Sequence, residues 1–575
     1  MRGVRKSLTP PKWLLAVPVI DRDLKGLEPF PSAAGILLWQ RGIRSYDDAV
    51  EFLKPDFSRR SDPRALTDMP KAVSRLKEAV VKKERIGIFG DFDHDGISGA
   101  VIFSQYLKDL GLQALVVIPD GFTEGHAFRE KHLEYFMDQG ISIIVTIDVG
   151  ITNGEVIEKA EKRGIHVIVL DHHILSQGLP RAFAVVDPKR EGSPVLLGSL
   201  CGAGVAFSCI DAAVREGLIP SRVTNSEQYL WRMLDRVAIA TIGDMVPMVG
   251  DNRILVAQGL EVMRKEPSMG VLALIKTCGV EQSGFTEEDV TFCLVPKINA
   301  AARMDHANTA FSVLSSERPE DAVPHIKRLE VSNRKRQQIA ERVFLEAVSL
   351  VEREEEIPWA IIVGDSHWPQ GILGVIASRL FERYHRPVVV FGIAKEVVRA
   401  SARSIPEFNL IAAMQSCGGN ALFGEFGGHA QAAGFSLRAD WLPTFKERFL
   451  VYAKAHLIPE MLTPVLNISL EVSLHELTPE FALFVQKLAP FGQGNPRPRF
   501  LLRNAAIVEI RAIGRNGAWR EVTLQAQGTG RSFRAMIDKV VAESVRPGNN
   551  VDVVFEFSGR GFYGRIIALR PHTEL

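Results

Sequence analysis

With 575 residues, the chain is too long for one ordinary domain, and its length predicts roughly three or four domains. The composition, 46% hydrophobic and 24% charged without any apolar run near the ~20 residues of a spanning helix, excludes a membrane-spanning protein and predicts a soluble, cytoplasmic one. The net charge of +1 excludes a general basic excess, so a surface for nucleic acid would need local clustering of Lys and Arg. Five scattered cysteines without a Cys-x-x-Cys pair argue against a zinc ribbon or a disulfide framework and fit a reducing compartment.

Residues 1–80 are predicted to form a helical accessory region, and residues 81–320 a catalytic α/β domain. Within the second region, short apolar strands alternate with amphipathic helices from Arg85 to Leu170. The predicted strands are Ile86–Phe89, Ala114–Ile118, Ile143–Ile147 and Val167–Leu170, with helices near Ser98–Leu110, Glu130–Gln139 and Asn153–Arg163. Continuous apolar strands separated by helices are typical of a parallel sheet covered on both faces, where function gathers at the C-terminal strand ends.

Residues 321–356 show an uninterrupted helical pattern, basic in its first half and acidic at its end, which predicts a connecting helix between two lobes. A solvated face is the simplest interpretation of those charges. A second α/β unit is predicted over residues 357–456. Short alternating strands then predict a small β-barrel over residues 464–575, for which an OB-fold is the natural candidate. Its clearest strands are Arg520–Gln525, Val551–Phe557 and Gly564–Leu569.

Three aspartates follow the first predicted strand in the segment Gly-Asp-Phe-Asp-His-Asp-Gly. On an extended backbone, Asp91, Asp93 and Asp95 would share one face, while Phe92 and His94 would point away. Three adjacent carboxylates repel one another and need cations, and hard divalent ions such as Mg²⁺ or Mn²⁺ prefer oxygen ligands. The alternatives are a surface acidic turn or a single calcium loop, although the spacing differs from that of an EF-hand.

Further candidate ligands follow later apolar runs. Asp148 ends one predicted strand, the run Asp171, His172, His173 ends another, and Asp244 follows a third apolar run. Neutral imidazole beside carboxylates suits Mn²⁺, whereas a buried histidine pair can also serve only to satisfy hydrogen bonds. Two ions held by shared carboxylates suit phosphoester hydrolysis, because they clamp the phosphate and generate hydroxide at neutral pH. The sequence has neither a P-loop nor a nucleophile-elbow serine.

In this order, these motifs resemble those of the DHH phosphoesterase superfamily. The motifs downstream resemble the RecJ family of bacterial single-strand exonucleases in particular, and the match spans nearly the whole chain. They are Asn299-Ala-Ala-Ala-Arg303, Asn333 with Arg336 and Gln337, the segment 371–379, Ser401-Ala-Arg-Ser404, the DHHA1-like segment 427–434, and Pro490-Phe-Gly-Gln-Gly-Asn-Pro496.

The resemblance implies a metal-dependent exonuclease that degrades single-stranded DNA 5′→3′ in DNA repair and recombination. A DHH lobe would hold two Mn²⁺ or Mg²⁺ ions, a DHHA1 lobe would close a groove over the strand, and His173 would touch the scissile phosphate. The implied metal ligands are Asp91, Asp93, Asp95, Asp148, His172 and Asp244. The implied substrate-binding residues, including a 5′-phosphate pocket, are Arg303, Asn333, Gln337, Arg379, Ser401, Arg403, Gly428 and His429. The implied partners are single-stranded DNA, a single-stranded DNA-binding protein and a DNA helicase.

The chain departs from the family pattern at five positions. The family usually has an Arg and a Gly-Tyr-Gly segment near Gly121 and His126, a Lys at Ser208, a Gly at Ala302 and a His at Pro369. These departures leave the metal ligands unchanged and concern the residues expected to hold the DNA strand.

Two other functions fit parts of the sequence. A DHH phosphodiesterase acting on short oligonucleotides or cyclic dinucleotides would not need the C-terminal barrel. A non-enzymatic scaffold would not need an intact ligand set. At single positions, Arg379 could form only a surface ion pair, and Gly427 with Gly428 could form only a turn.

Overall fold

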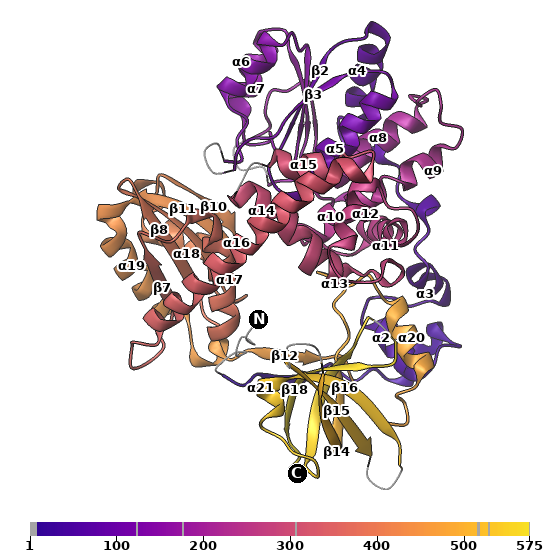
Figure 1. Cartoon of the computed structure of the whole chain (residues 1–575), viewed down its shortest axis with the longest axis vertical. Coiled ribbons are helices and arrows are strands. Elements are labelled where there is room, and N and C mark those ends of the chain that lie inside the picture. The colour runs from indigo at the N-terminus through magenta and orange to yellow at the C-terminus, as the bar shows by residue number, and fades with distance from the viewer. Residues whose placement is uncertain are drawn as a thin grey trace.

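The computed structural model describes residues 9–121, 125–174, 178–304, 307–513, 518–526, 530–559 and 561–573, apart from the side chains of Asp21, residues 302–304 and Glu425. Two α/β lobes joined by a long helix lie at two corners of a triangle, and a C-terminal barrel lies at the third (Figure 1). This architecture confirms the predicted fold class. Over these described ranges, no helix has the length and apolar character needed to cross a membrane.

The first lobe contains a five-stranded, wholly parallel sheet in the order β3-β2-β4-β5-β6. Helices α4, α5 and α8 share a core with one face of this sheet, while α6 and α7 share a core with the other. The predicted helix start at Ser98 is wrong, because α5 begins at His94. The strands are β2 (Ile86–Gly90), β3 (Ala114–Val117), β4 (Ile143–Ile147), β5 (His166–Leu170) and the unforeseen β6 (Ala184–Val186). The helices are α4 (Met69–Lys82), α5 (His94–Asp109), α6 (Glu130–Asp138), α7 (Gly154–Lys162) and α8 (Gly202–Arg215).

A helical layer completes this lobe and leads into the connecting helix α16 (Pro319–Val351). The N-terminal half of α16 contributes Ala322 and Leu329 to the core of the first lobe, and its C-terminal half contributes Val343 and Ala347 to the second lobe. One continuous helix therefore belongs to both lobes and fixes their spacing. The intervening helices are α9 (Ser226–Trp231), α10 (Leu234–Gly243), α11 (Gly250–Lys265), α12 (Met269–Lys276), α13 (Glu287–Asp289), α14 (Val295–Met304) and α15 (Asn308–Leu314).

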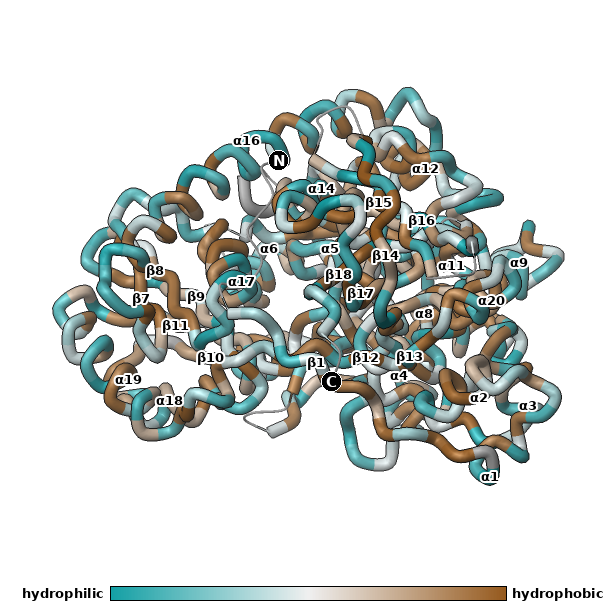
Figure 2. Tube along the Cα trace, turned by 90° about the horizontal axis from the view of Figure 1, so that it is seen from below, coloured by the Kyte–Doolittle hydropathy of each residue, from teal (hydrophilic) through white to brown (hydrophobic). Residues whose placement is uncertain are grey.

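The second lobe has a mixed sheet in the order β10-β11-β9-β8-β7, in which only β7 and β8 run parallel. Hydrophobic residues dominate its inner strands, whereas α16 alternates between hydrophobic and hydrophilic residues along its length (Figure 2). The strands are β7 (Ile361–Asp365), β8 (Val388–Ala394), β9 (Val397–Arg403), β10 (Glu425–His429) and β11 (Ala432–Arg438). The helices are α17 (Leu373–Tyr384), α18 (Leu410–Cys417) and α19 (Leu442–His456).

The C-terminal barrel closes because β14 pairs with both β15 and β17. An aromatic cluster that includes Phe500, Phe533 and Phe555 fills its interior. The strands are β13 (Leu470–Glu471), β14 (Phe500–Ile513), β15 (Trp519–Ala526), β16 (Ser532–Asp538), β17 (Asn550–Phe557) and β18 (Gly564–Pro571). The helices are α20 (Pro479–Lys487) and α21 (Lys539–Ala542).

The N-terminal region differs from the uniform helical region expected. It opens with a strand, β1 (Lys12–Leu15), which pairs in parallel with β12 (Val465–Ile468) before the barrel. Leu37 and Leu38 then pack into the core of the barrel, whereas residues from Phe57 onward pack against the first lobe. Residues 12–53 thus pack with the C-terminal part of the chain. Their helices are α1 (Asp21–Leu24), α2 (Ser32–Trp39) and α3 (Tyr46–Leu53).

The cysteine prediction is wrong at one pair. Cys278 and Cys293 form a disulfide bond with a Cα–Cα distance of 5.8 Å. Their spacing of 15 residues gives no local signal, because the pair forms only when the segment after α12 packs on the π-helical turn Val290–Leu294. The other three cysteines, Cys201, Cys209 and Cys417, are free and buried.

A chain that ends before Pro464 should lose order in residues 12–53, because these residues pack against the barrel. Exposing Leu37 and Leu38 removes about 1.5–3 kcal/mol of burial each, so amide protection there should fall at least tenfold. Hydrogen exchange of full-length and truncated chains measures this, with α4 as an internal control that stays protected. Equal protection of residues 12–53 in both chains would show that the barrel does not hold them.

Candidate metal centre

Acidic residues continue directly from the carboxyl ends of neighbouring strands. The amide of Asp91, after β2, donates to the carbonyl of Ile147 at 3.2 Å, and the amide of Asp148, after β4, donates to Leu170 at 2.9 Å. Asp171 follows β5 in the same way. The ladder of sheet hydrogen bonds therefore extends to these residues and sets their spacing. In this strand order, β2 and β4 flank the topological switch point, where open α/β sheets bind ligands.

The next two carboxylates reach the site from a helix, so the prediction of one extended face is wrong. Asp93 is the N-cap of α5, and its Oδ1 accepts hydrogen bonds from the amides of Asp95 (2.8 Å) and Gly96 (3.3 Å). His94 is buried, and both its amide and Nδ1 bond Oδ1 of Asn299. A helix N-terminus stabilises negative charge, which favours a turn into helix at this point over a continued strand.

Asp95 is held by a second helix N-terminus. The amides of Gly202 and Ala203, at the start of α8, donate to Oδ2 and Oδ1 of Asp95 at 2.7 Å each. Oδ2 also lies 3.7 Å from Nε2 of His172. Each carboxylate oxygen keeps a second lone pair, so Asp95 can bind an ion directly or orient the imidazole of His172.

The predicted ligands converge in three overlapping groups. Within each group, one ligand atom per residue lies within 4.8 Å of the others. The groups are Asp91, Asp93 and Asp148; Asp95, His172 and Asp244; and Asp148, His172 and His173. Since Asp148 and His172 each belong to two groups, the site has room for neighbouring ion positions that share a carboxylate.

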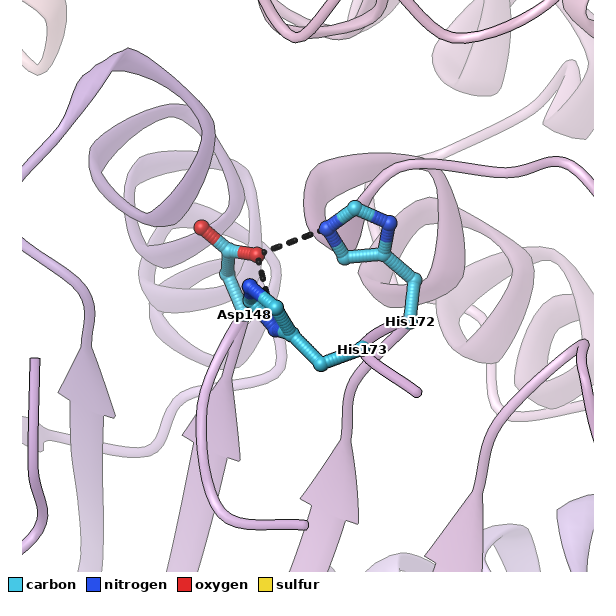
Figure 3. Close-up of side chains that lie close together, drawn as sticks. All are labelled: Asp148, His172 and His173. Atoms are coloured by element: carbon cyan, nitrogen blue, oxygen red, sulfur yellow. Dashed lines mark ion pairs between the residues drawn. The ribbon is translucent and has the colours of Figure 1, made fainter. Parts of the chain in front are cut away.

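The carboxylate of Asp148 faces the imidazoles of both His172 and His173 in the close-up of the site (Figure 3). Its Oδ1 is 3.1 Å from Nε2 of His172 and 4.0 Å from Nδ1 of His173. Nε2 of His172 also lies 3.7 Å from Oδ2 of Asp244. One imidazole therefore faces carboxylates delivered by a strand end and by the end of helix α10.

The donor set fits a hard divalent cation. Oδ1 of Asp91 and Oδ1 of Asp148 are buried without a hydrogen-bond donor among the described residues, an arrangement that is costly for a carboxylate unless a cation is bound. Burial and the nearby carboxylates raise the pKa of Asp148 well above its usual value and that of Asp244 to about 8. Clustered carboxylates with one or two imidazoles are the ligands that Mn²⁺ and Mg²⁺ accept.

Two residues outside the implied ligand set contact its members. Oδ1 of Asp171 bonds Nδ1 of His173 at 2.8 Å, and its Oδ2 accepts from the amide of Ile151 at 2.9 Å, so this carboxylate orients the imidazole. His126 bonds Oδ2 of Asp91 through Nδ1 at 2.7 Å. Asp171 was noted in the sequence as the start of its Asp-His-His run, although without a role, whereas His126 gave no signal beyond its departure from the family pattern.

A cavity of about 640 Å³ lies between the two lobes beside these ligands. Asp93 and His126 line it from the first lobe, and Arg399, Ser401 and Arg403 of β9 line it from the second. These three residues alternate along one strand and therefore share one face. The sequence analysis missed Arg399, although its spacing of two from Ser401 was a usable signal.

The other predicted substrate residues are dispersed. Gly428, in β10, has φ of +132°, and a Cβ there would lie 2.3 Å from the carbonyl oxygen of Ala432, so only glycine fits. His429 is exposed at the end of β10. The side chain of Arg303 lies outside the described residues.

Three residues do not line this cavity. Asn333 is buried in α16 and accepts hydrogen bonds from Arg336, while Gln337 is exposed on the same helix. Arg379 bonds Glu341 at 2.8 Å and stacks on Phe344 with 3.8 Å to the ring centroid. The described contacts of Arg379 are those of an ion pair between α17 and the connecting helix.

Comparison with known proteins agrees with this geometry. The DHH family N-terminal domain matches residues 85–241, the DHHA1 domain matches residues 356–455, and the RecJ OB domain matches residues 468–567. The chain is 31% identical to the single-stranded-DNA-specific exonuclease RecJ of Haemophilus influenzae, over 79% of this chain and 81% of that protein. It is 32% identical to RecJ of Bacillus subtilis over 91% of this chain, which spans 65% of that longer relative.

The chain belongs to the RecJ family. The structure of RecJ from Thermus thermophilus in complex with Mn²⁺ matches it with a TM-score of 0.81 and 27% identity, over 98% of this chain and 80% of that one. The corresponding Mg²⁺ complex matches with a TM-score of 0.74 and 25% identity, over 98% and 79%. The expected cofactor, Mn²⁺ or Mg²⁺, agrees with these complexes and with the donor set of this RecJ-family chain.

The pairing of Asp171 with His173 should appear as a shifted titration in metal-free protein. Burial opposes the charged imidazole, but the hydrogen bond to Asp171 outweighs it and raises the pKa of His173 to about 9. The Asp171→Asn variant should return this pKa toward 6.5, the ordinary value for histidine. NMR titration of the His173 ring proton measures the shift, and a pKa that stays near 9 in the variant would contradict the assignment.

The same pair predicts how stability depends on pH. Because the pKa of His173 is raised in the folded state, its contribution to the free energy of unfolding is fully present below pH 6.5. That contribution is lost as the pH rises through about 9. The pKa of Asp171 is lowered to about 2 because its bond to His173 outweighs burial. Its contribution to stability is therefore fully present above pH 3.8 and is lost as the pH falls through about 2. The stabilities of metal-free wild type and Asp171→Asn, measured by urea unfolding, should therefore differ most between pH 3.8 and 6.5 and least above pH 9.

Proposed function

We propose that this chain is a two-metal exonuclease that hydrolyses single-stranded DNA with 5′→3′ polarity, acting in the cytoplasm in DNA repair and recombination. The observation that carries the proposal is a set of ligand groups sharing Asp148 beside a cavity whose opposite wall presents two arginines. The proposed ligands are those implied by the sequence: Asp91, Asp93, Asp95, Asp148, His172 and Asp244. The polarity and the biological role rest on the family.

The chain's own residues orient the reaction. When bound, two divalent ions would polarise the scissile phosphate and lower the pKa of a water molecule. Asp148 supplies a carboxylate within reach of both ligand groups. Asp171 holds Nδ1 of His173, which leaves Nε2 free to donate a hydrogen bond to a phosphate oxygen or to the leaving group. A divalent centre of this kind also offsets the repulsion among its buried carboxylates.

The wall formed by β9 suits a terminal phosphate. Ser401 and Arg403 lie opposite Gly374, near the start of α17, where an added Cβ would be 3.3 Å from Oγ of Ser401 and 3.7 Å from Nη2 of Arg403. The missing side chain leaves space in front of these two groups. A guanidinium beside a hydroxyl can bind phosphate oxygens bidentately, which supports a 5′-phosphate pocket.

The alternative functions have less support. A phosphodiesterase for short oligonucleotides or cyclic dinucleotides does not account for the RecJ OB domain match over residues 468–567. A scaffold role does not account for buried carboxylate oxygens that no described donor satisfies. By family resemblance, we also infer a single-stranded DNA-binding protein and a DNA helicase as working partners.

With Mn²⁺, wild-type protein should degrade single-stranded DNA from its 5′ end, and EDTA should abolish this activity. Asp148→Asn should reduce the rate at least a hundredfold, because loss of a shared ligand removes several kcal/mol of transition-state stabilisation. The variant should unfold at the same or a higher temperature without metal, since it relieves carboxylate repulsion. The assay compares 5′- and 3′-labelled single strands, duplex DNA and RNA; digestion from the 3′ end or of dinucleotides alone would refute the proposal.

Arg403→Ala should erase any preference for a 5′-phosphorylated end, while cleavage of 5′-hydroxyl strands should fall less. Charge-assisted hydrogen bonds contribute about 1.5–3 kcal/mol each, enough to change end preference tenfold or more. Arg399→Ala is the matched control, because this arginine lies on the same face of β9, whereas the atoms nearest to an added Cβ at Gly374 belong to Ser401 and Arg403. Matched 5′-phosphate and 5′-hydroxyl oligonucleotides distinguish the two roles, and equal losses on both substrates in Arg403→Ala would indicate general backbone contact.

A further inference from the structure

The segment Phe491–Pro496 forms a tight turn between α20 and β14, and the proposed function assigns it no role. Gly492 and Asn495 exchange two backbone hydrogen bonds of 3.0 and 3.1 Å. Gly494 has φ of +76°, a left-handed conformation that favours glycine. The turn is therefore a defined structural unit and not an extended linker before the barrel.

Buried polar side chains hold this turn in place. Asn495 is 1% exposed; its Nδ2 donates to the carbonyls of Leu488 (2.9 Å) and Pro490 (2.8 Å), and its Oδ1 accepts from Nε of Arg41 at 2.8 Å. Arg253, from α11 of the first lobe, is also buried and donates to the carbonyl of Leu488 at 2.9 Å. The N-terminal segment, the first lobe and the approach to the barrel thus meet at one hydrogen-bonded joint.

The same turn contacts the loop that follows Asp244. The amide of Met248 donates to the carbonyl of Gln493 at 2.7 Å. A Cβ at Gly492 would lie 3.3 Å from Cε of Met248, and one at Gly494 would lie 3.3 Å from Cγ1 of Val249. The glycines therefore let the backbone of the turn approach residues 245–249 closely.

Asp244 needs such support more than the strand-borne ligands do. It is the C-cap of α10, and Met245, directly after it, has φ of 55° and is 72% exposed. No strand ladder fixes this carboxylate, although it must stay near Asp95 and His172 despite carboxylate repulsion. On its other side, the loop is held where Nδ2 of Asn252 donates to the carbonyl of Pro247 at 3.0 Å.

We propose that the turn Phe491–Pro496 is a positioning element of the metal centre: it clamps residues 245–249 and thereby holds the carboxylate of Asp244 for metal binding. This inference rests on the proposed function, because it takes Asp244 as a ligand. The segment that leads into the barrel then contributes to metal affinity in the first lobe, and it also joins that lobe to the barrel. Residues that orient a ligand from outside typically change metal affinity by 10–100-fold when they are lost.

Asn495→Ala tests the inference, because it removes the bonds that hold the turn without touching any ligand. Gly494→Ala is a second variant that keeps the side chain of Asn495 but strains the turn, through its left-handed backbone and its close contact with Val249. Arg565→Gln is the matched control. Arg565 lies in the barrel and bonds Glu288 of the first lobe at 3.2 Å, but it has no described contact with residues 245–249. Each full-length protein is titrated with Mn²⁺ by calorimetry, and hydrogen exchange follows the amide of Met248.

The expected result is that both turn variants fold, exchange the Met248 amide faster and bind one Mn²⁺ at least tenfold more weakly, whereas Arg565→Gln matches wild type. Faster exchange at Met248 with unchanged Mn²⁺ affinity would overturn the inference and leave the turn a purely structural joint. Unchanged exchange in both variants would overturn it as well. Wild-type protein that binds no Mn²⁺ would instead refute the proposed function, which keeps the two failures distinct.

Discussion

Repulsion among buried carboxylates is the constraint on which this structure depends. Five aspartates lie within three overlapping groups of ligand atoms, and burial raises the pKa of Asp91, Asp148 and Asp244. Such a cluster persists only if the backbone holds it against its own repulsion and a cation neutralises it. The backbone holds the cluster because aspartates follow the ends of adjacent strands. The N-termini of α5 and α8 also lie against Asp93 and Asp95 and stabilise their charges. Asp148 itself has φ of 62°, an uncommon conformation for a non-glycine residue and a sign of local strain at the site.

The remaining architecture holds the cavity wall formed by β9 at a fixed distance from this centre. Because α16 is part of the cores of both lobes, the spacing between the ligands and β9 is set by one rigid helix. The N-terminal residues connect the two ends of the chain, since β1 pairs with β12 and α2 packs into the barrel. The barrel is thus tied to the first lobe through Arg253 and through the ion pair of Arg497 with Glu287 at 2.9 Å. Because the two lobes and the barrel are connected by these several contacts, they cannot move as independent domains.

The sequence predicted those features that local pattern determines. Apolar strand runs located β2, β4 and β5 within a residue, and the residues after them were correctly expected at one edge of the sheet. The route of Asp93 and Asp95 was not foreseen, because the α8 amides that bond Asp95 lie 107 and 108 positions away in the sequence. The pairing of β1 with β12 and the Cys278–Cys293 bond join segments without local signals, so only the folded chain reveals them. His126 was visible only as a departure, and its contact with Asp91 joins residues 35 positions apart in the chain.

The candidate ligands and the cavity wall are held in different ways. The candidate ligands are positioned mainly by main-chain hydrogen bonds at strand ends and helix N-termini. The cavity between the two lobes is lined by side chains, and there a residue can change without disturbing the sheet hydrogen bonds behind it. Gly121 and His126, two of the five departures from the family pattern, line this cavity beside Phe92, and His126 bonds Asp91 there. The departure at Ser208 is instead buried in α8. The cavity wall therefore accepts a different residue at these two positions, while the buried carboxylates stay fixed by the backbone.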